Sequence, residues 1–242
     1  PPKSLCLHYR YPAWEEGNAM TVTVLLPAYN EETRIIDTLR AVKGLSLVDE
    51  IIVVNDGSND RTSERVREMG VTLIDLPTNM GKGGAMNAAL PYINSDIVVF
   101  LDADLGSSAK EAIKIIEVVR DGLCDLAIAA FPPPTRKGGF GLVKGTAAWA
   151  IRRAGKMEVT APLSGQRAMT RRALEMLSPF DEDYGVELGM TIKALALGLR
   201  VMEVPTTMSH KETGRDIKGF LHRGKQFLDV IRVLNKLRRN GL

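Results

Sequence analysis

Two aspartates, Asp102 and Asp104, are the residues whose type and spacing best fit a chemical role in this sequence. They follow an apolar run at 97–101, which has the length of a buried parallel strand and is too short to span a membrane. Side chains two positions apart on an extended backbone point the same way, so both carboxylates can address one point. Such a pair suits a hard divalent cation bound together with substrate phosphates. The alternative is that Asp102 caps the next helix and Asp104 lies in solvent.

Strands and helices alternate along the first 130 residues, which favours an α/β fold with a mostly parallel central sheet flanked by helices. Apolar runs predict the strands, and periodic apolar faces ending at glycine predict the helices. The expected strands are 21–28, 50–55, 71–76, 97–101 and 125–130. The expected helices are 31–43 with Asn30 as its N-cap, 59–69, 85–92 after a glycine-rich turn at 79–84, and 109–120.

The last third of the chain is less regular. Proline and glycine at 131–145 predict a loop or crossover. The elements expected after it are helices near 142–153, 171–177 and 184–197, a strand at 200–204, and a basic helix at 217–239.

The composition excludes several classes of protein. With 242 residues, 45% of them apolar and 25% charged, the chain resembles an ordinary soluble globular protein. The net charge of +3 is too small to indicate a nucleic-acid partner. No apolar run approaches the roughly 18 residues of a transmembrane helix. The two cysteines, Cys6 and Cys124, do not indicate a disulfide framework, and we expect a reducing cytosol.

Every distinctive loop follows a predicted strand, so all four loops are expected along the carboxyl edge of the sheet, where open α/β sheets bind ligands. The loops are Pro27-Ala28-Tyr29-Asn30-Glu31, Val54-Asn55-Asp56-Gly57-Ser58, Gly81-Lys82-Gly83 and Asp102-Ala103-Asp104-Leu105. Through these motifs the chain resembles family 2 type glycosyltransferases with the GT-A fold. The resemblance covers 21–107 and is looser beyond.

The resemblance implies a nucleotide-sugar pocket at this edge, in which an ionised Asp56 would accept hydrogen bonds from the base or ribose. Lys82 would lie near the charged part of the nucleotide. The residues implied for nucleotide-sugar binding are Pro27, Ala28, Tyr29, Glu31, Asp56, Ser58, Lys82, Asp102 and Ala103. The alternatives are a plain turn at Asp56 with Ser58 as a helix cap, and a solvated Lys82.

The resemblance also implies a divalent cofactor, Mn²⁺ or Mg²⁺, which neutralises charge on the departing diphosphate. Asp104 would hold the ion with help from Asp102. Two carboxylates do not complete an octahedral site, and His210 is the third ligand that related sugar-transferring enzymes suggest. A surface or capping histidine is the alternative.

The acceptor side resembles two branches of the superfamily, the glucosyl-3-phosphoglycerate synthases and the polyprenyl-phosphate sugar transferases. The motifs are Pro162-Leu163-Ser164-Gly165-Gln166-Arg167 and Tyr184-Gly185-Val186-Glu187. Glu187, or next Asp183, would act near the reacting centre, as general base in an inverting enzyme or by orienting the sugar in a retaining one. The residues expected to bind the acceptor are Ser164, Gly165, Arg167 and Arg215.

The expected function is transfer of a sugar, UDP-linked by preference, to a phosphorylated acceptor, either a small acid such as 3-phosphoglycerate or polyprenyl phosphate. A single domain at 20–242 follows an irregular leader at 1–19, with a donor half at 20–130 and an acceptor half at 131–242. The expected location is cytoplasmic, and contact with the inner face of a membrane and homodimerisation are left open. The alternatives are a sugar-phosphate nucleotidylyltransferase, whose glycine-rich first loop is missing here, and an inactive nucleotide-binding scaffold.

Overall fold

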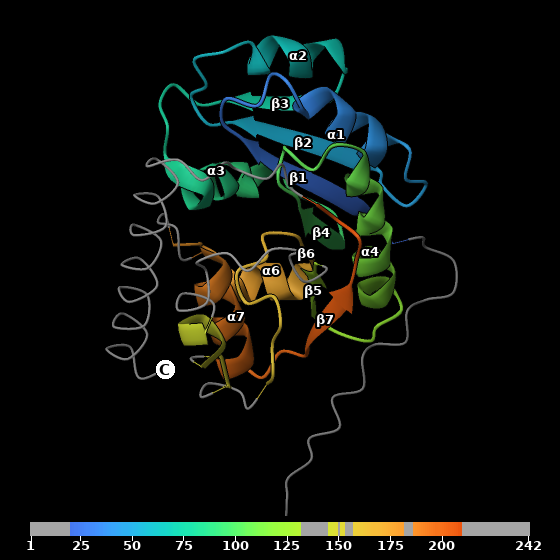
Figure 1. The fold of residues 1–242 in the computed structure, drawn as a ribbon, viewed down its shortest axis with the longest axis vertical. Helices are drawn as coiled ribbons and strands as arrows, with labels where there is room; N and C mark the ends of the chain where they lie inside the picture. Colours follow the sequence, from blue (N-terminus) through green and yellow to red (C-terminus); the bar gives the residue numbers. More distant parts are fainter. Residues whose placement is uncertain (1–19, 132–144, 150, 153–156, 182–185, 210–242) are drawn as a thin grey trace, which may run out of the picture.

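A computed structural model describes residues 20–131, 145–149, 151–152, 157–181 and 186–209 (Figure 1). The strands are β1 Val22–Ala28, β2 Glu50–Asn55, β3 Thr72–Asp75, β4 Ile97–Phe100, β5 Leu126–Ala130, β6 Arg167–Thr170 and β7 Val201–Pro205. The helices are α1 Ile35–Lys43, α2 Thr62–Glu68, α3 Gly81–Ala89, α4 Ala112–Arg120, α6 Arg171–Leu177 and α7 Val186–Ala196, with 3-10 turns at Leu90–Tyr92 and Gly106–Glu111. The leader predicted at 1–19, most of the loop predicted at 131–145 and the basic helix predicted at 217–239 lie outside the described residues.

The described strands form one sheet in the order β3-β2-β1-β4-β6-β5-β7. Strand β6 runs antiparallel to both of its neighbours, and the other pairs are parallel. The expectation of a mostly parallel sheet flanked by helices is therefore confirmed.

Helices cover both faces of the sheet (Figure 1). Val24 and Leu26 of β1 point to one face and pack in a core with α1, α2 and α4. Leu25 points to the other face and packs in a second core with α3, α6 and α7. This alternation makes β1 apolar on both faces, because a central parallel strand is buried on each side.

The structure differs from the predictions in three places. The segment that forms β6 is predicted to be irregular, but it is a strand. Helix α3 begins at Gly81, inside the stretch predicted as a turn. Asn30 is not the N-cap of α1, which starts at Ile35 after Arg34. Instead Asn30 adopts a left-handed φ of 57° and its Oδ1 accepts a hydrogen bond from Asn59 N at 2.8 Å. Asparagine tolerates this conformation better than other non-glycine residues.

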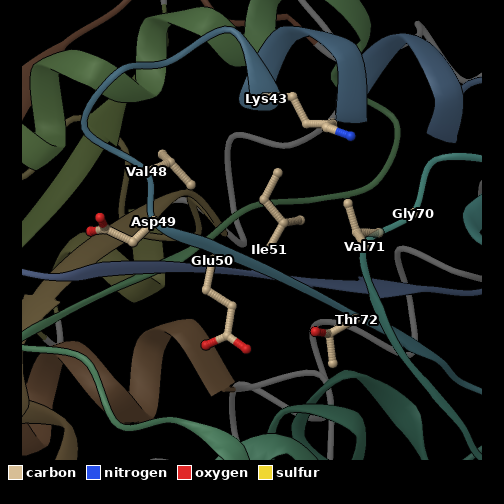
Figure 2. A pocket seen from close by; sticks show the side chains of 8 residues that line it. All are labelled: Lys43, Val48, Asp49, Glu50, Ile51, Gly70, Val71 and Thr72. Atoms are coloured by element: carbon tan, nitrogen blue, oxygen red, sulfur yellow. The ribbon is translucent and has the colours of Figure 1, made fainter.

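A pocket of about 300 Å³ lies at the amino ends of β2 and β3, opposite the motif loops (Figure 2). Its charged side chains are engaged by the protein itself. Asp49 Oδ2 accepts from Val22 N at 2.7 Å, and Lys43 Nζ donates to Met69 O at 2.9 Å. The charged groups of this pocket therefore stabilise the fold, whereas the motif loops lie at the other edge of the sheet.

Candidate functional site

The motif loops meet where the strand order reverses. The chain runs from β1 outward to β2 and β3, then returns to place β4 on the other side of β1. Such a switch point leaves an opening beyond the carboxyl ends of the two central strands, where ligands bind in open α/β sheets. Leu101 N donates to Leu25 O at 3.1 Å, so the Asp102–Asp104 segment lies alongside the end of β1.

Asp102 is held by the protein through both carboxylate oxygens. Lys82 Nζ donates to Oδ1 at 2.6 Å, and Gln166 Nε2 donates to Oδ2 at 2.8 Å. Gln166 is fully buried, and its Oε1 accepts from Asp102 N at 3.1 Å. These contacts fix the orientation of the Asp102 side chain without leaving it fully buried.

Lys82 lies between two carboxylates that are far apart in the sequence, Asp102 and Glu187. In addition to Asp102, its Nζ contacts Glu187 Oε1 at 2.8 Å. Burial alone would lower the pKa of Lys82, but the charges of Asp102 and Glu187 outweigh it and raise that pKa. Lys82 is therefore a permanent cation that joins the first turn of α3, the end of β4 and the first turn of α7.

Gly165 packs directly against this ion pair. A Cβ at position 165 would lie 2.3 Å from Lys82 Nζ and about 3 Å from both carboxylate oxygens of Asp102. A side chain at this position would have to displace the Lys82 ammonium from its place beside Asp102. The glycine thus lets the chain after Ser164 close over the Lys82–Asp102 pair.

The Asp104 side of the site concentrates negative charge. Arg34 Nη1 donates to Asp104 O at 3.1 Å, and Thr38 Oγ1 donates to Ala103 O at 2.8 Å, so α1 fixes the backbone of this segment. Burial, and then the charge of Asp104, raises the pKa of Glu31 to about 7. A bound cation would relieve this repulsion.

Asp56 is buried and tied to the loop before α3. Its Oδ1 accepts from Met80 N at 2.7 Å. Gly57 has a φ of 67°, and a Cβ there would lie 2.7 Å from the backbone of Thr78 and Asn79. Ser58 does not cap α2, since its Oγ accepts from Asn30 N at 2.9 Å. The loops after β1, β2 and β3 therefore form one connected wall.

The structure brings Lys82, Asp102, Gly165 and Glu187 into one cluster, with Glu31 and Asp104 beside it. Arg167 is only 1% exposed, and its donors face Ser164 O and Thr191 Oγ1. Its expected contact with an acceptor stays a prediction. Three further residues proposed from the sequence lie outside the described residues: Asp183, His210 and Arg215.

The carboxylate oxygens of Asp104 and the neighbouring Glu31 fit a hard divalent cation in charge and chemistry. Within the described ranges no group of three or more His, Cys, Asp or Glu side chains is arranged to hold a metal ion. Asp104 would therefore bind the ion with ligands from outside those ranges, from substrate or from water.

Gln166 is a site residue that sequence reasoning missed. It stands in the quoted Pro162–Arg167 motif, but no spacing in the sequence links it to Asp102, 64 residues earlier. Only the pairing of β6 with β4 brings the two together.

Comparison with known proteins gives close matches. Residues 23–174 match the model of glycosyl transferase family 2. The glucosyl-3-phosphoglycerate synthase of Mycobacterium tuberculosis is 31% identical over 222 residues, which cover 75% of this chain and 64% of that protein. The chain thus spans less than two thirds of that relative. The undecaprenyl-phosphate mannosyltransferase of Micrococcus luteus is 28% identical over 214 residues, 81% of this chain and 86% of that protein.

Solved structures of the M. tuberculosis synthase share the fold. Its complex with Mn²⁺, UDP and phosphoglyceric acid has a TM-score of 0.75 and 28% identity, and the match covers 93% of this chain and 83% of that one. Its complex with Mg²⁺ and UDP has a TM-score of 0.74 and 28% identity, covering 89% and 78%. The expected GT-A fold is confirmed.

A search of the described residues finds no helix long and apolar enough to cross a membrane. The family match covers more than half of the sequence and includes the four motif loops that meet at the switch point. The chain belongs to glycosyl transferase family 2.

Proposed function

We propose that this chain transfers a sugar from a UDP-sugar to a phosphorylated acceptor with the help of Mn²⁺ or Mg²⁺. The observation that carries the proposal is Lys82, held between Asp102 and Glu187 beside Asp104 at the switch point. A charged diphosphate needs cations around it, and a sugar undergoing transfer needs carboxylates near its anomeric carbon. Solved relatives that carry UDP with Mn²⁺ or Mg²⁺ support the same assignment.

On the donor side, we assign the nucleoside to the wall formed by the loops after β1 and β2. Asp56 and Ser58 would face the base or ribose, with the half-exposed Tyr29 at the rim. Pro27, Ala28 and Glu31 would complete the wall, while Ala103 and Asp102 would face the sugar nucleotide.

Asp104 would hold the metal ion together with His210. The ion, when bound, supplies the positive charge that stabilises the departing diphosphate. Lys82 adds a second cation that the protein itself keeps in place.

On the acceptor side, we assign Glu187 and Asp183 to the reacting centre, and Ser164, Gly165 and Arg215 to the acceptor. A small phosphorylated acid and polyprenyl phosphate share a phosphate monoester, which Arg215 could bind with two parallel hydrogen bonds. The complex of the M. tuberculosis structure with phosphoglyceric acid supports the small acid, and the M. luteus relative supports the lipid phosphate.

Calorimetric titration of UDP and GDP, each with Mn²⁺ and with chelator, tests the donor side. We expect UDP to bind only with the metal. Incubation of UDP-glucose with 3-phosphoglycerate and, separately, with a short polyprenyl phosphate then tests transfer. Binding of UDP without transfer to either acceptor would favour the inactive scaffold. Formation of a nucleotide sugar from a sugar phosphate and UTP would favour the nucleotidylyltransferase.

A further inference from the structure

Arg167 is a buried arginine with a specific set of contacts. It begins β6 and is 1% exposed. Its Nε donates to Ser164 O at 2.9 Å, and its Nη1 donates to Thr191 Oγ1 at 2.8 Å. Its Nη2 has no hydrogen-bond partner among the described residues. Burial of a guanidinium that is incompletely paired is costly, so this position calls for a physical reason.

The first contact leads to the Lys82–Asp102 pair. Ser164 O, which accepts from Arg167, belongs to the residue directly before Gly165. Gly165 in turn packs on Lys82 Nζ and on both carboxylate oxygens of Asp102. The arginine therefore fixes the backbone that closes over the ion pair.

The second contact leads to Glu187. Thr191 Oγ1 accepts from Arg167 and donates to Glu187 O at 2.9 Å, one turn earlier in α7. The carboxylate of Glu187 contacts Lys82 Nζ. Arg167 thus connects the two sides of the Lys82 ammonium. One route is its hydrogen bond to Ser164 O and the packing of Gly165, and the other is its hydrogen bond to Thr191 and that of Thr191 to Glu187 O.

The surroundings keep Arg167 charged and its segment fixed. Burial lowers the pKa of Arg167 to about 10, while Glu187 and Glu203 act in the opposite direction, so it is protonated at neutral pH. Glu203 accepts from Thr160 N and from Ala161 N at 2.7–3.0 Å. The segment from Thr160 to Arg167 is therefore attached to β7 at its start and to α7 at its end.

We infer that Arg167 is a positioning residue, which holds Gly165 and Glu187 at the separation that keeps Lys82 between Asp102 and Glu187. The inference deepens the proposed function and rests on it for its effect on turnover. Because the side chain is buried, we assign Arg167 this positioning role in place of the direct contact with an acceptor that the sequence predicts.

Hydrogen exchange of backbone amides tests the positioning without any substrate. Thr191→Val removes the hydroxyl with little change of shape, and Arg167→Met removes the guanidinium. We expect Arg167→Met to speed exchange about tenfold or more both at 160–166 and at the start of α7, and Thr191→Val to do so in α7 alone. Thr191→Ser, which keeps the hydroxyl, should exchange like the wild type.

Arg200→Lys is the matched control, because Arg200 also binds the sheet, through Asp125 and Gly122 O, but at the opposite edge. It should leave exchange at 160–166 and in α7 unchanged. If Arg167→Met does not fold, Thr191→Val alone tests whether the contact between Arg167 and Thr191 holds the start of α7. Unchanged exchange at the start of α7 in Thr191→Val would overturn the inference.

Transfer kinetics provide the second readout. In Thr191→Val we expect kcat to fall about tenfold or more, with KM for the UDP-sugar unchanged, because the donor wall is untouched. In a Glu187→Gln background the same substitution should cause no further loss, since it acts through Glu187. An equal fold loss in both backgrounds would show a general structural effect and overturn the inference. A wild-type chain that neither binds UDP nor transfers sugar would refute the proposed function. Hydrogen exchange would still test whether Arg167 positions Gly165 and Glu187.

Discussion

The Nζ of Lys82 lies 2.8 Å from Oε1 of Glu187, so the start of α3 and the start of α7 meet through one ion pair. The two residues are far apart in the sequence. Lys82 also contacts Asp102, so its ammonium lies between two carboxylates. The contact links the donor side of the proposed site to its acceptor side, and it can be tested from either partner.

Replacing Lys82 by methionine should lower the rate of sugar transfer by about a hundredfold or more, because a preorganised charge near a departing diphosphate contributes on that scale. The measurement is kcat with UDP-glucose at saturating acceptor. Lys110→Met removes an exposed lysine from the 3-10 turn that follows the Asp104 segment and should keep the wild-type rate. Wild-type turnover in Lys82→Met would remove Lys82 from the catalytic machinery.

Asp104→Asn should abolish metal-dependent binding of UDP while leaving the thermal unfolding temperature nearly unchanged, since the amide has the same size but a much weaker affinity for the ion. Calorimetry with Mn²⁺ and with chelator measures the difference. The control is Asp37→Asn, an exposed acid on α1 whose ion pair lies in solvent. Metal-dependent binding of UDP by Asp104→Asn, as strong as that of Asp37→Asn, would contradict the metal assignment.

Gly165→Ala should displace Lys82, because the new methyl group would lie 2.3 Å from its Nζ. We expect lower turnover, and destabilisation of about 1–3 kcal/mol if the backbone moves as well. Thermal unfolding and transfer assays measure both effects. Gly145→Ala, where nothing lies within 4 Å of the added Cβ, is the matched control. A Gly165→Ala variant that is as active as the wild type would mean that Lys82 can serve from another position.

Glu31→Gln should stabilise the metal-free protein, and more strongly at pH 8 than at pH 5. Glu31 has a folded-state pKa of about 7 against an ordinary 4.5, so between these values the native state holds more protons than the unfolded state. Its contribution to stability therefore falls as the pH rises through that window. Glutamine removes the titration.

Unfolding temperatures at the two pH values, in chelator, give the measurement for Glu31. The exposed Glu117, replaced by glutamine, should show no such pH-dependent difference. A Glu31→Gln variant with the same gain at both pH values would contradict the raised pKa.

Much of the fold could be predicted from the sequence because central parallel strands are apolar on both faces. Strands β1, β2 and β4 are such runs, and each ends at a loop of polar or glycine residues. Strand β6 could not be recognised in this way. It has four residues and begins with an arginine, and it is a strand because β4 and β5 pair with it from either side.

The candidate site could be predicted in part, because several of its residues belong to recognisable motifs that follow these strands. Asp102, Lys82 and Glu187 stood out by motif, and the structure places them in contact. The role of Gln166 was invisible because its partner is 64 residues away, and nothing in the sequence measures that approach. Local preference predicts a helix cap at Asn30, but its contact with the loop after β2 determines its backbone conformation.

The insertion of β6 between β4 and β5 also has a consequence for biosynthesis. As the chain leaves the ribosome, β1 to β4 can pair as soon as they emerge, but β5 has no neighbour in the sheet until Arg167–Thr170 follows. Until then both β4 and β5 expose unpaired edges, which are templates for association with other nascent chains. Gln166 and Arg167, which hold Asp102 and the segment before Gly165, take their places only when β6 pairs, so a chain that stops before β6 lacks part of the proposed site and keeps two open strand edges.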